Sequence, residues 1–159
     1  MDTETPIGVT FAGFMPLGPA VAIDVAKEAE GLGFSSFWTA ETTGPEAFAV
    51  LGAVGGVAPG LDLGTGVLAL QLRTPMVTAM AAATLQALVP DRDVLLGIGI
   101  SSPVVTQKWH GVPYGDRPLD RALLHLRHAR RPAHHEHLSR RRAASVVARH
   151  RRSHGNRRR

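Results

Sequence analysis

Cysteine is absent from all 159 residues of the sequence. This absence excludes disulfide bonds, thiolate metal sites and a cysteine nucleophile. Long apolar runs are also missing, because the best candidate, over 47–58, is interrupted by glycines and is shorter than the roughly 18 residues of a membrane span. The acidic N-terminal residues are not followed by the apolar core of a secretory signal. We therefore expect a soluble, cytoplasmic protein that does not contact a membrane.

Lysine is scarce, and the basic side chains are unevenly distributed along the chain. The overall net charge is +5. Residues 1–121 contain six basic and twelve acidic side chains, a net charge of −6, whereas residues 122–159 contain twelve arginines and one glutamate, a net charge of +11. We therefore expect two parts, an acidic body over 1–121 and an Arg/His-rich tail over 122–159. Because 44% of the residues are hydrophobic, the body can form a buried core.

Short β-rich runs alternate with segments of helical periodicity in the body. Strands are expected over 7–14, 34–40, 61–70 and 94–100, and helices over 22–32, 45–57 and 76–88, while 101–109 stays open between helix and loop. The pair Thr74-Pro75 predicts a helix cap followed by a first-turn proline. The spacing also predicts that Leu32 lies on the buried stripe of its helix and that Met76 and Met80 belong to the core.

Strands that alternate with helices at this spacing favour right-handed βαβ units and a parallel sheet. Two α/β architectures fit the residues: an open doubly wound sheet, or part of an eight-stranded β/α barrel. A dinucleotide-binding sheet needs a Gly-x-Gly-x-x-Gly turn after an early strand. The two candidates, at 64–69 and 97–102, have Ala69 and Ser102 at the third glycine position. Neither is a dinucleotide fingerprint, and both architectures remain open on this evidence.

Four segments, taken together, carry a family resemblance. They are AEGLGFSSFW over 29–38, LGTGV over 63–67, RTP over 73–75 with AATL over 82–85, and LGIG over 96–99. In this order and spacing they resemble the luciferase-like monooxygenase superfamily, in particular its deazaflavin-dependent branch, over about 7–120. The resemblance implies a partial TIM-type (βα) barrel of about four βα units. It also implies an oxidoreductase or monooxygenase that uses the deazaflavin coenzyme F420, with FMN as the alternative.

The resemblance further implies a cofactor ring over the C-terminal ends of the strands, where barrel enzymes place their chemistry. The residues that it assigns to cofactor binding are Glu41, Gly66, Val67, Leu68, Gly99 and Ser101. Many relatives carry a cis peptide bond at the position of Gly66-Val67. Three of these assignments have a simpler alternative: Glu41 as a carboxylate at a helix start, Gly66 as an ordinary strand glycine, and Ser101 as a helix cap. No catalytic residue and no metal site is assigned.

Three other residues near these strand ends have more than one interpretation. His110 could be a general base, but a single loop histidine beside Trp109 is more often structural. Trp38 is expected in the core or the wall of a pocket. Arg73 is expected either to meet an anion of the cofactor or substrate, or to be solvated.

The tail does not continue the pattern of the body. Residues 122–159 are rich in Arg, His and Ala, and they contain no lysine and no Phe, Tyr or Trp. This composition is typical of a shifted reading frame in a GC-rich gene, and we expect a frameshift product or a disordered or irregular helical segment. The alternative function is a non-enzymatic protein that binds nucleic acid through the tail, non-specifically and with strong salt dependence. The run His134-His135-Glu136-His137 lacks a fold that would fix metal geometry.

A body of this length has consequences for activity. A β/α barrel usually takes about 250 residues, and its phosphate site usually comes from the loops after strands seven and eight. Four strands cannot close such a barrel, and their edges would be left open. We therefore expect a truncated and poorly active fragment of an enzyme with a small-molecule substrate. A homodimer that completes the ring is a further expectation.

Overall fold

The computed structural model describes residues 6–114 and 145–148, the latter as backbone only. The elements in chain order are β1 (Gly8–Thr10), the 3-10 helix η1 (Phe11–Leu17), α1 (Val21–Gly31), β2 (Ser36–Thr39), α2 (Ala47–Val57), β3 (Asp62–Ala69), α3 (Pro75–Leu88), β4 (Val94–Gly99), the π-helical segment η2 (Val104–Trp109) and β5 (Ser145–Ala148). The alternation of strands and helices that the sequence predicts is therefore confirmed.

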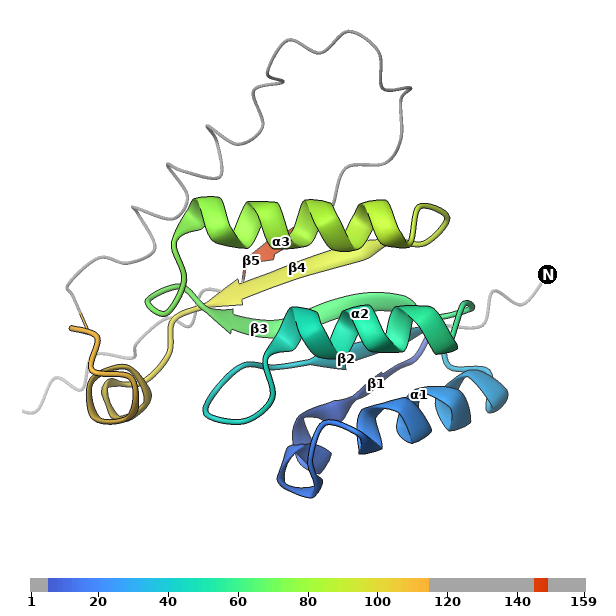
Figure 1. Cartoon of the computed structure of the whole chain (residues 1–159), viewed down its shortest axis with the longest axis horizontal. Helices are drawn as coiled ribbons and strands as arrows, with labels where there is room; N and C mark the ends of the chain where they lie inside the picture. The colour runs from blue at the N-terminus through green and yellow to red at the C-terminus, as the bar shows by residue number, and fades with distance from the viewer. Residues whose placement is uncertain (1–5, 115–144, 149–159) are drawn as a thin grey trace, which may run out of the picture.

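The strands form one parallel sheet in the order β1-β2-β3-β4-β5. In the register of the first four strands, Val9 lies opposite Phe37, Phe37 opposite Leu63, and Leu63 opposite Val94. Figure 1 shows α1, α2 and α3 on one face of the sheet, with the arrowheads of β3 and β4 pointing toward the same end of the molecule. The carboxyl ends of the strands therefore form a common edge, as in the first part of a β/α barrel.

The core lies between the sheet and the three helices. The larger buried cluster combines Phe37, Leu63 and Val94 from the strands with Leu51 and Val54 from α2. A smaller cluster lies nearer the carboxyl ends of β3 and β4 and consists of Ala47, Leu68, Ala82, Leu96 and Ile98. Side chains alternate along a strand, so the residues next to these buried positions, such as Gly64 and Gly97, face away from the helices.

The helix starts follow local side-chain chemistry. Thr74 accepts a hydrogen bond from the Val77 N–H at 3.3 Å, and Pro75 is the first residue of α3, which confirms the predicted start. Glu46 starts α2 by accepting hydrogen bonds from the N–H groups of Phe48 and Ala49. β1 is shorter than the predicted strand over 7–14, because the Thr10 hydroxyl caps η1 through Ala12 N.

Two predictions of buried side chains are wrong. Met76 and Met80 are 67% and 61% exposed, and the buried face of α3 consists of Thr78, Ala82 and Leu85. α3 is apolar on most of its surface, so the spacing of two methionines does not identify the face that packs on the sheet. Leu32 is 75% exposed because α1 ends at Gly31, one residue before it.

The structure adds a strand that the sequence did not predict. β5 pairs in parallel with β4, and Val146 lies opposite Leu96. The β-branched pair Val146-Val147 favours an extended chain, and the outer edge of β4 supplies backbone groups for pairing. The remainder of the tail lies outside the described residues, and so do the domain boundary at 121 and the frameshift, nucleic-acid and metal interpretations. Within the described ranges, no helix combines the length and apolar character needed to cross a membrane.

Candidate functional site

The pairing of β3 and β4 is interrupted by a bulge near the carboxyl edge. Thr65 lies opposite Leu96 and Leu68 lies opposite Ile98, so two residues of β3, Gly66 and Val67, stand against one of β4. The Gly66-Val67 peptide bond is cis, as the resemblance implied. The buried Thr65 hydroxyl donates to the carbonyl of Gly97 at 2.9 Å and accepts from its N–H at 3.0 Å. One side chain therefore satisfies both backbone groups of the residue opposite the bulge.

Glycines line the face of the sheet that points away from the helices. A Cβ atom at Gly97 would lie 2.0 Å from the carbonyl oxygen of Thr65, and one at Gly99 would lie 2.9 Å from Val67 Cγ2. A Cβ atom at Gly64 would lie 2.4 Å from the Trp38 ring, whose Nε1–H donates to Ser36 Oγ at 2.9 Å. Trp38 and Val67 therefore lie directly on a surface of bare backbone. We call the surface formed by Gly64, Gly66, Gly97 and Gly99 the glycine face.

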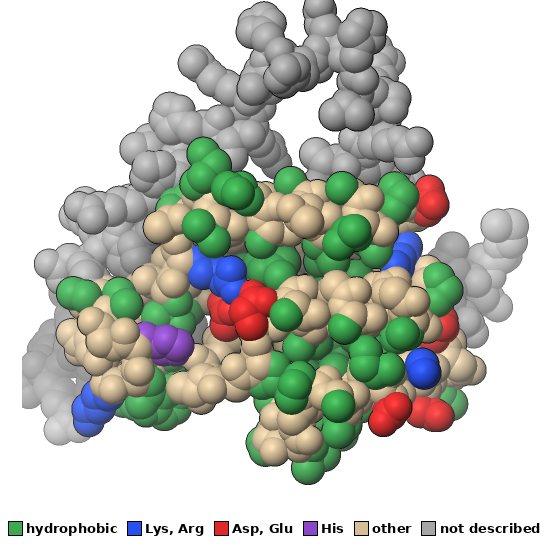
Figure 2. Space-filling model, viewed as in Figure 1, with side chains coloured by type: hydrophobic (Ala, Val, Ile, Leu, Met, Phe, Trp, Pro, Cys, Tyr) green, Lys and Arg blue, Asp and Glu red, His purple; other side chains and the backbone are tan. Residues whose placement is uncertain are grey.

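An ion pair joins the loops that follow β2 and β3. Arg73 donates from Nε to Glu41 Oε2 at 2.7 Å and from Nη2 to Glu41 Oε1 at 2.6 Å, and it also pairs with Glu46. The side chains of Arg73 and Glu41 are only 16% and 14% exposed. The Arg73 guanidinium also lies over the Phe48 ring, 5.3 Å from its centre. Arg73 is therefore a paired residue of this edge and not a solvated side chain. Figure 2 shows basic and acidic side chains side by side between α2 and α3.

The pair fixes the charge state of both groups. Burial acts to raise the pKa of Glu41, but the hydrogen bonds and charge of Arg73, with smaller contributions from the Ala47 backbone and the charge of His110, lower it below its ordinary value. The hydrogen bonds to Glu41 raise the pKa of Arg73, despite its partial burial. Glu41 is therefore a carboxylate at neutral pH, where it can accept hydrogen bonds but does not donate a proton.

Gln71 and Ser101 connect the ends of β3 and β4. The Ser101 N–H donates to Gln71 Oε1 at 3.2 Å, and the Leu70 N–H donates to the Gly99 carbonyl at 2.9 Å. Among the described residues, no group accepts a hydrogen bond from the buried Gln71 Nε2. The interpretation of Ser101 as a helix cap is wrong, because Ser102 Oγ accepts the Val105 N–H at 3.3 Å.

His110 closes the edge from the side of η2. Its Nε2 lies 2.5 Å from the Thr42 carbonyl oxygen, in the loop that follows β2. The ring therefore ties η2 to this loop, and the contact supports the structural interpretation of His110.

The structure gathers the six residues assigned to cofactor binding along one edge. The Glu41 N–H donates to the Val67 carbonyl at 3.4 Å, and Val67 covers Gly99. Leu68 differs from the others because its side chain is 1% exposed and belongs to the core beneath the helices, so only its backbone reaches the glycine face. The binding role of all six remains a prediction. The assignment did not include Gln71 and Arg73, whose signal is their position directly after β3.

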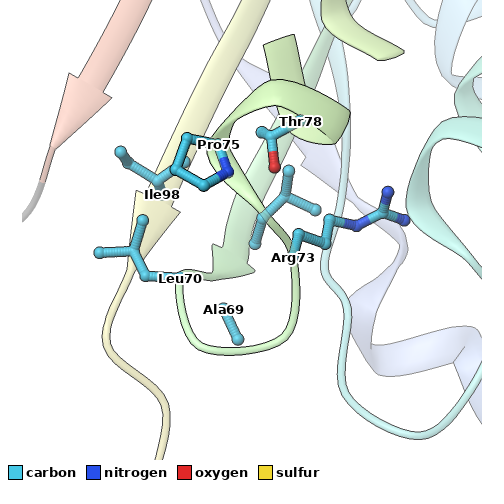
Figure 3. Close-up of a pocket in the computed structure, with 7 residues that line it drawn as sticks. Ala69, Leu70, Arg73, Pro75, Thr78 and Ile98 are labelled. Atoms are coloured by element: carbon cyan, nitrogen blue, oxygen red, sulfur yellow. The ribbon is translucent and has the colours of Figure 1, made fainter. Parts of the chain in front are cut away.

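A shallow hollow lies beside the ion pair, on the helix side of the sheet. It is lined by Leu68, Ala69, Leu70, Arg73, Pro75, Thr78 and Ile98. Figure 3 shows the Arg73 guanidinium directed away from Pro75 and Ile98, toward the neighbouring loop. The hollow is therefore mostly apolar, and the sheet separates it from the glycine face.

A family model described as luciferase-like monooxygenase matches residues 10–148. The chain belongs to the luciferase-like monooxygenase family. This match extends past residue 121 and includes β5. A relative from Mycobacterium tuberculosis, provisionally named as a coenzyme F420-dependent oxidoreductase, is 34% identical over 121 residues. That alignment covers 76% of this chain and 34% of the relative, so the chain spans about a third of the length of this curated protein.

Solved structures of luciferase-like proteins share the fold at low sequence identity. The F420-dependent tetrahydromethanopterin reductase of Methanopyrus kandleri is 24% identical with a TM-score of 0.62, over 73% of this chain and 32% of the reductase. An F420-dependent secondary alcohol dehydrogenase is 23% identical with a TM-score of 0.69, over 80% and 42%. The FMN-bound oxygenating constituent of 3,6-diketocamphane monooxygenase from Pseudomonas putida is 17% identical with a TM-score of 0.68, over 79% and 39%.

Proposed function

We propose that the carboxyl edge of the sheet binds the planar ring of a flavin-type cofactor and that the chain serves the oxidation or reduction of a small molecule. The observation that carries this proposal is the glycine face. A Cβ atom at Gly64 or Gly99 would collide with Trp38 or Val67, so the glycines let these two apolar side chains lie close against the sheet. Val67 and Trp38 therefore cover the glycine face with apolar atoms, and a flat aromatic ligand would lie against these two side chains.

The assigned residues would hold the ring in different ways. Val67 packs on the glycine face, and Gly66, Leu68, Gly99 and Ser101 present backbone groups near it. The Glu41 carboxylate stays charged and is fixed by Arg73, so it orients polar groups and is not a proton donor. The bound cofactor supplies the hydride or electron transfer, while the protein provides position and excludes water.

The choice of cofactor follows the relatives. The curated relative and two of the structural neighbours are named for coenzyme F420, and one neighbour is described with FMN. We therefore propose F420, with FMN as the alternative. Both contain a fused three-ring system of similar size, so the glycine face suits either.

We also propose that this chain by itself binds the ring without firmly holding the phosphate end, and that its turnover is poor. In β/α barrels the phosphate site usually comes from the loops after strands seven and eight. The described residues contain five strands. Riboflavin, which lacks the phosphate, should then bind within about threefold of FMN, a difference well under 1 kcal/mol. A large preference for FMN that disappears in high salt would instead indicate anchoring by the arginine-rich tail.

Titration of the full chain with F420, FMN and riboflavin, followed by cofactor fluorescence, tests the proposal. Gly99→Ala should weaken ring binding at least about tenfold, because its methyl group displaces Val67. Gly52→Ala is the matched control, since a Cβ at Gly52 meets no atom within 4 Å and the change leaves the edge intact. If the chain without substitutions binds none of the three ligands, the proposed function is refuted.

A further inference from the structure

The carboxamide of Gln71 has one satisfied end and one unsatisfied end. Its Oε1 accepts the Ser101 N–H at 3.2 Å, while its Nε2 is buried and has no acceptor among the described residues. Rotating the carboxamide by half a turn would place Nε2 against the Ser101 N–H, donor against donor. The Ser101 backbone therefore fixes which end is unsatisfied. Because buried polar groups nearly always have partners, this donor calls for an explanation.

The other glutamine with a described hydrogen-bond network shows that the fold can satisfy such a group. Gln86 donates from Nε2 to the carbonyls of Val89 at 3.2 Å and Arg92 at 2.8 Å, and its Oε1 accepts the Val94 N–H at 3.3 Å. Gln86 lies at the amino ends of the strands, where it ties α3 to β4. The unsatisfied donor is thus specific to the edge that carries the candidate site.

We infer that Gln71 Nε2 donates a hydrogen bond to a ring carbonyl of the bound cofactor. This inference rests on the proposed function and adds a residue to the cofactor-binding set. Flavin and deazaflavin rings both carry two carbonyl oxygens on their pyrimidine portion, and these atoms only accept hydrogen bonds. A ring carbonyl oxygen that leaves water on binding therefore needs a hydrogen-bond donor from the protein in place of the lost water.

The neighbouring side chains narrow the choice of donor. Arg73 directs its donors to Glu41 and Glu46, and the Glu41 carboxylate would repel a carbonyl oxygen. Gln71 is anchored through Ser101, next to Gly99 on the glycine face, and its Nε2 carries hydrogens that no described group accepts. Gln71 thus supplies a neutral, buried donor at this edge.

Two substitutions separate the donor from the rest of the side chain. Gln71→Glu keeps the oxygen that accepts from Ser101 and replaces the donor with an acceptor. Gln71→Met has a similar length, carries no charge and removes the donor. Both should weaken FMN and riboflavin binding by about tenfold in a fluorescence titration of the full chain. Gln86→Glu is the matched control, and it should lower the unfolding midpoint while leaving both affinities unchanged.

A direct readout comes from the side-chain amide of Gln71, whose ¹⁵N–¹H resonances, assigned by their loss in Gln71→Met, should move when riboflavin is added. If the unchanged chain binds riboflavin but these resonances stay in place, or if Gln71→Met binds as tightly, the inference is overturned and the proposed function stands. If only Gln71→Glu loses affinity, its new charge is the cause and the inference also fails. Absence of binding to F420, FMN and riboflavin by the unchanged chain overturns both proposals together.

Discussion

The two ends of the sheet each hold one arginine and one glutamine, and they use them differently. At the amino end, Arg92 donates to the carbonyls of Gly55 at 2.6 Å, Ala58 at 2.7 Å and Leu61 at 3.1 Å, and Gln86 is fully paired with backbone. At the carboxyl end, Arg73 is held by carboxylates, and the amide nitrogen of Gln71 has no partner among the described groups.

The polar side chains at the amino end of the sheet serve the stability of the fold, whereas those at the carboxyl end remain available for binding. The polar side chains of the amino end are used to close the last turn of α2 and the start of β4, so few of their donors remain for a ligand. The carboxyl end keeps fixed charges and a buried donor beside the glycine face, which Trp38 and Val67 cover. This asymmetry agrees with the general division of a β/α barrel, in which the carboxyl face carries the chemistry and the opposite face supports the fold.

The largest effect should follow from Arg92→Met, which removes the donors that close the amino end. Three backbone carbonyls would lose hydrogen bonds from a charged group, and we expect the free energy of unfolding to fall by about 2–3 kcal/mol. Urea unfolding followed by tryptophan fluorescence measures this loss. Riboflavin affinity should stay the same under native conditions. If Arg92→Met is as stable as the original chain, or if it folds but loses riboflavin binding, the proposed difference between the two ends of the sheet is contradicted.

Arg73→Met should have the opposite effects, a small loss of stability and a larger loss of riboflavin affinity. The ion pair is partly solvent-exposed on the Glu46 side, so its loss should lower the free energy of unfolding by only about 1 kcal/mol. Riboflavin affinity should fall several-fold, since Glu41 would lose the side chain that fixes its position. Arg73→Lys, which cannot make the two-pronged contact, should be intermediate. If Arg73→Met reduced stability as much as Arg92→Met, the two ends would not differ in the proposed way.

The sequence predicts the repeating units well because burial imposes different periods on strands and helices. The alternation of apolar runs indicates a parallel sheet, and Thr74-Pro75 marks the start of α3. Periodicity fails where a helix is apolar on most faces, so Met76 and Met80 were placed in the core although they are exposed. It also could not show that β1 ends where the Thr10 hydroxyl begins to cap η1.

The sequence predicts which residues of the candidate site lie at the strand ends, but it does not predict the contacts between them. Glu41 and Ser101 come directly after strands, and parallel strands bring those ends together. The partner of Glu41 is 32 residues away in the chain, and nothing in the spacing indicates that Arg73 turns toward it. The unsatisfied end of Gln71 depends on the hydrogen bond from Ser101, which only the three-dimensional arrangement shows.

A smaller effect should appear as a pH dependence at the carboxyl end. The pKa of Glu41 is lowered in the folded protein from an ordinary value of 4.5, so its charge stabilises the fold above that pH and the contribution is lost as the pH falls toward the folded pKa. The stability difference between the original chain and Glu41→Gln should therefore shrink between pH 5 and pH 3. Glu28→Gln, on the exposed face of α1, is the control. A difference that stays constant over this range would show that the Arg73 pair does not set the charge of Glu41.

The smallest expected effect is on stability, in substitutions of the adjacent residues Ser101 and Ser102. Comparing the two substitutions distinguishes a role of the backbone from a role of the side chain at the carboxyl end. Ser102→Ala removes the oxygen that accepts the Val105 N–H, and it should cost about 0.5–1 kcal/mol locally at the start of η2. Ser101→Ala keeps the backbone N–H that holds Gln71, so it should change stability by less than about 0.5 kcal/mol. Amide hydrogen exchange of Val105 distinguishes the two variants, with faster exchange expected only in Ser102→Ala. Faster exchange in Ser101→Ala would mean that its hydroxyl, and not only its backbone, organises the edge.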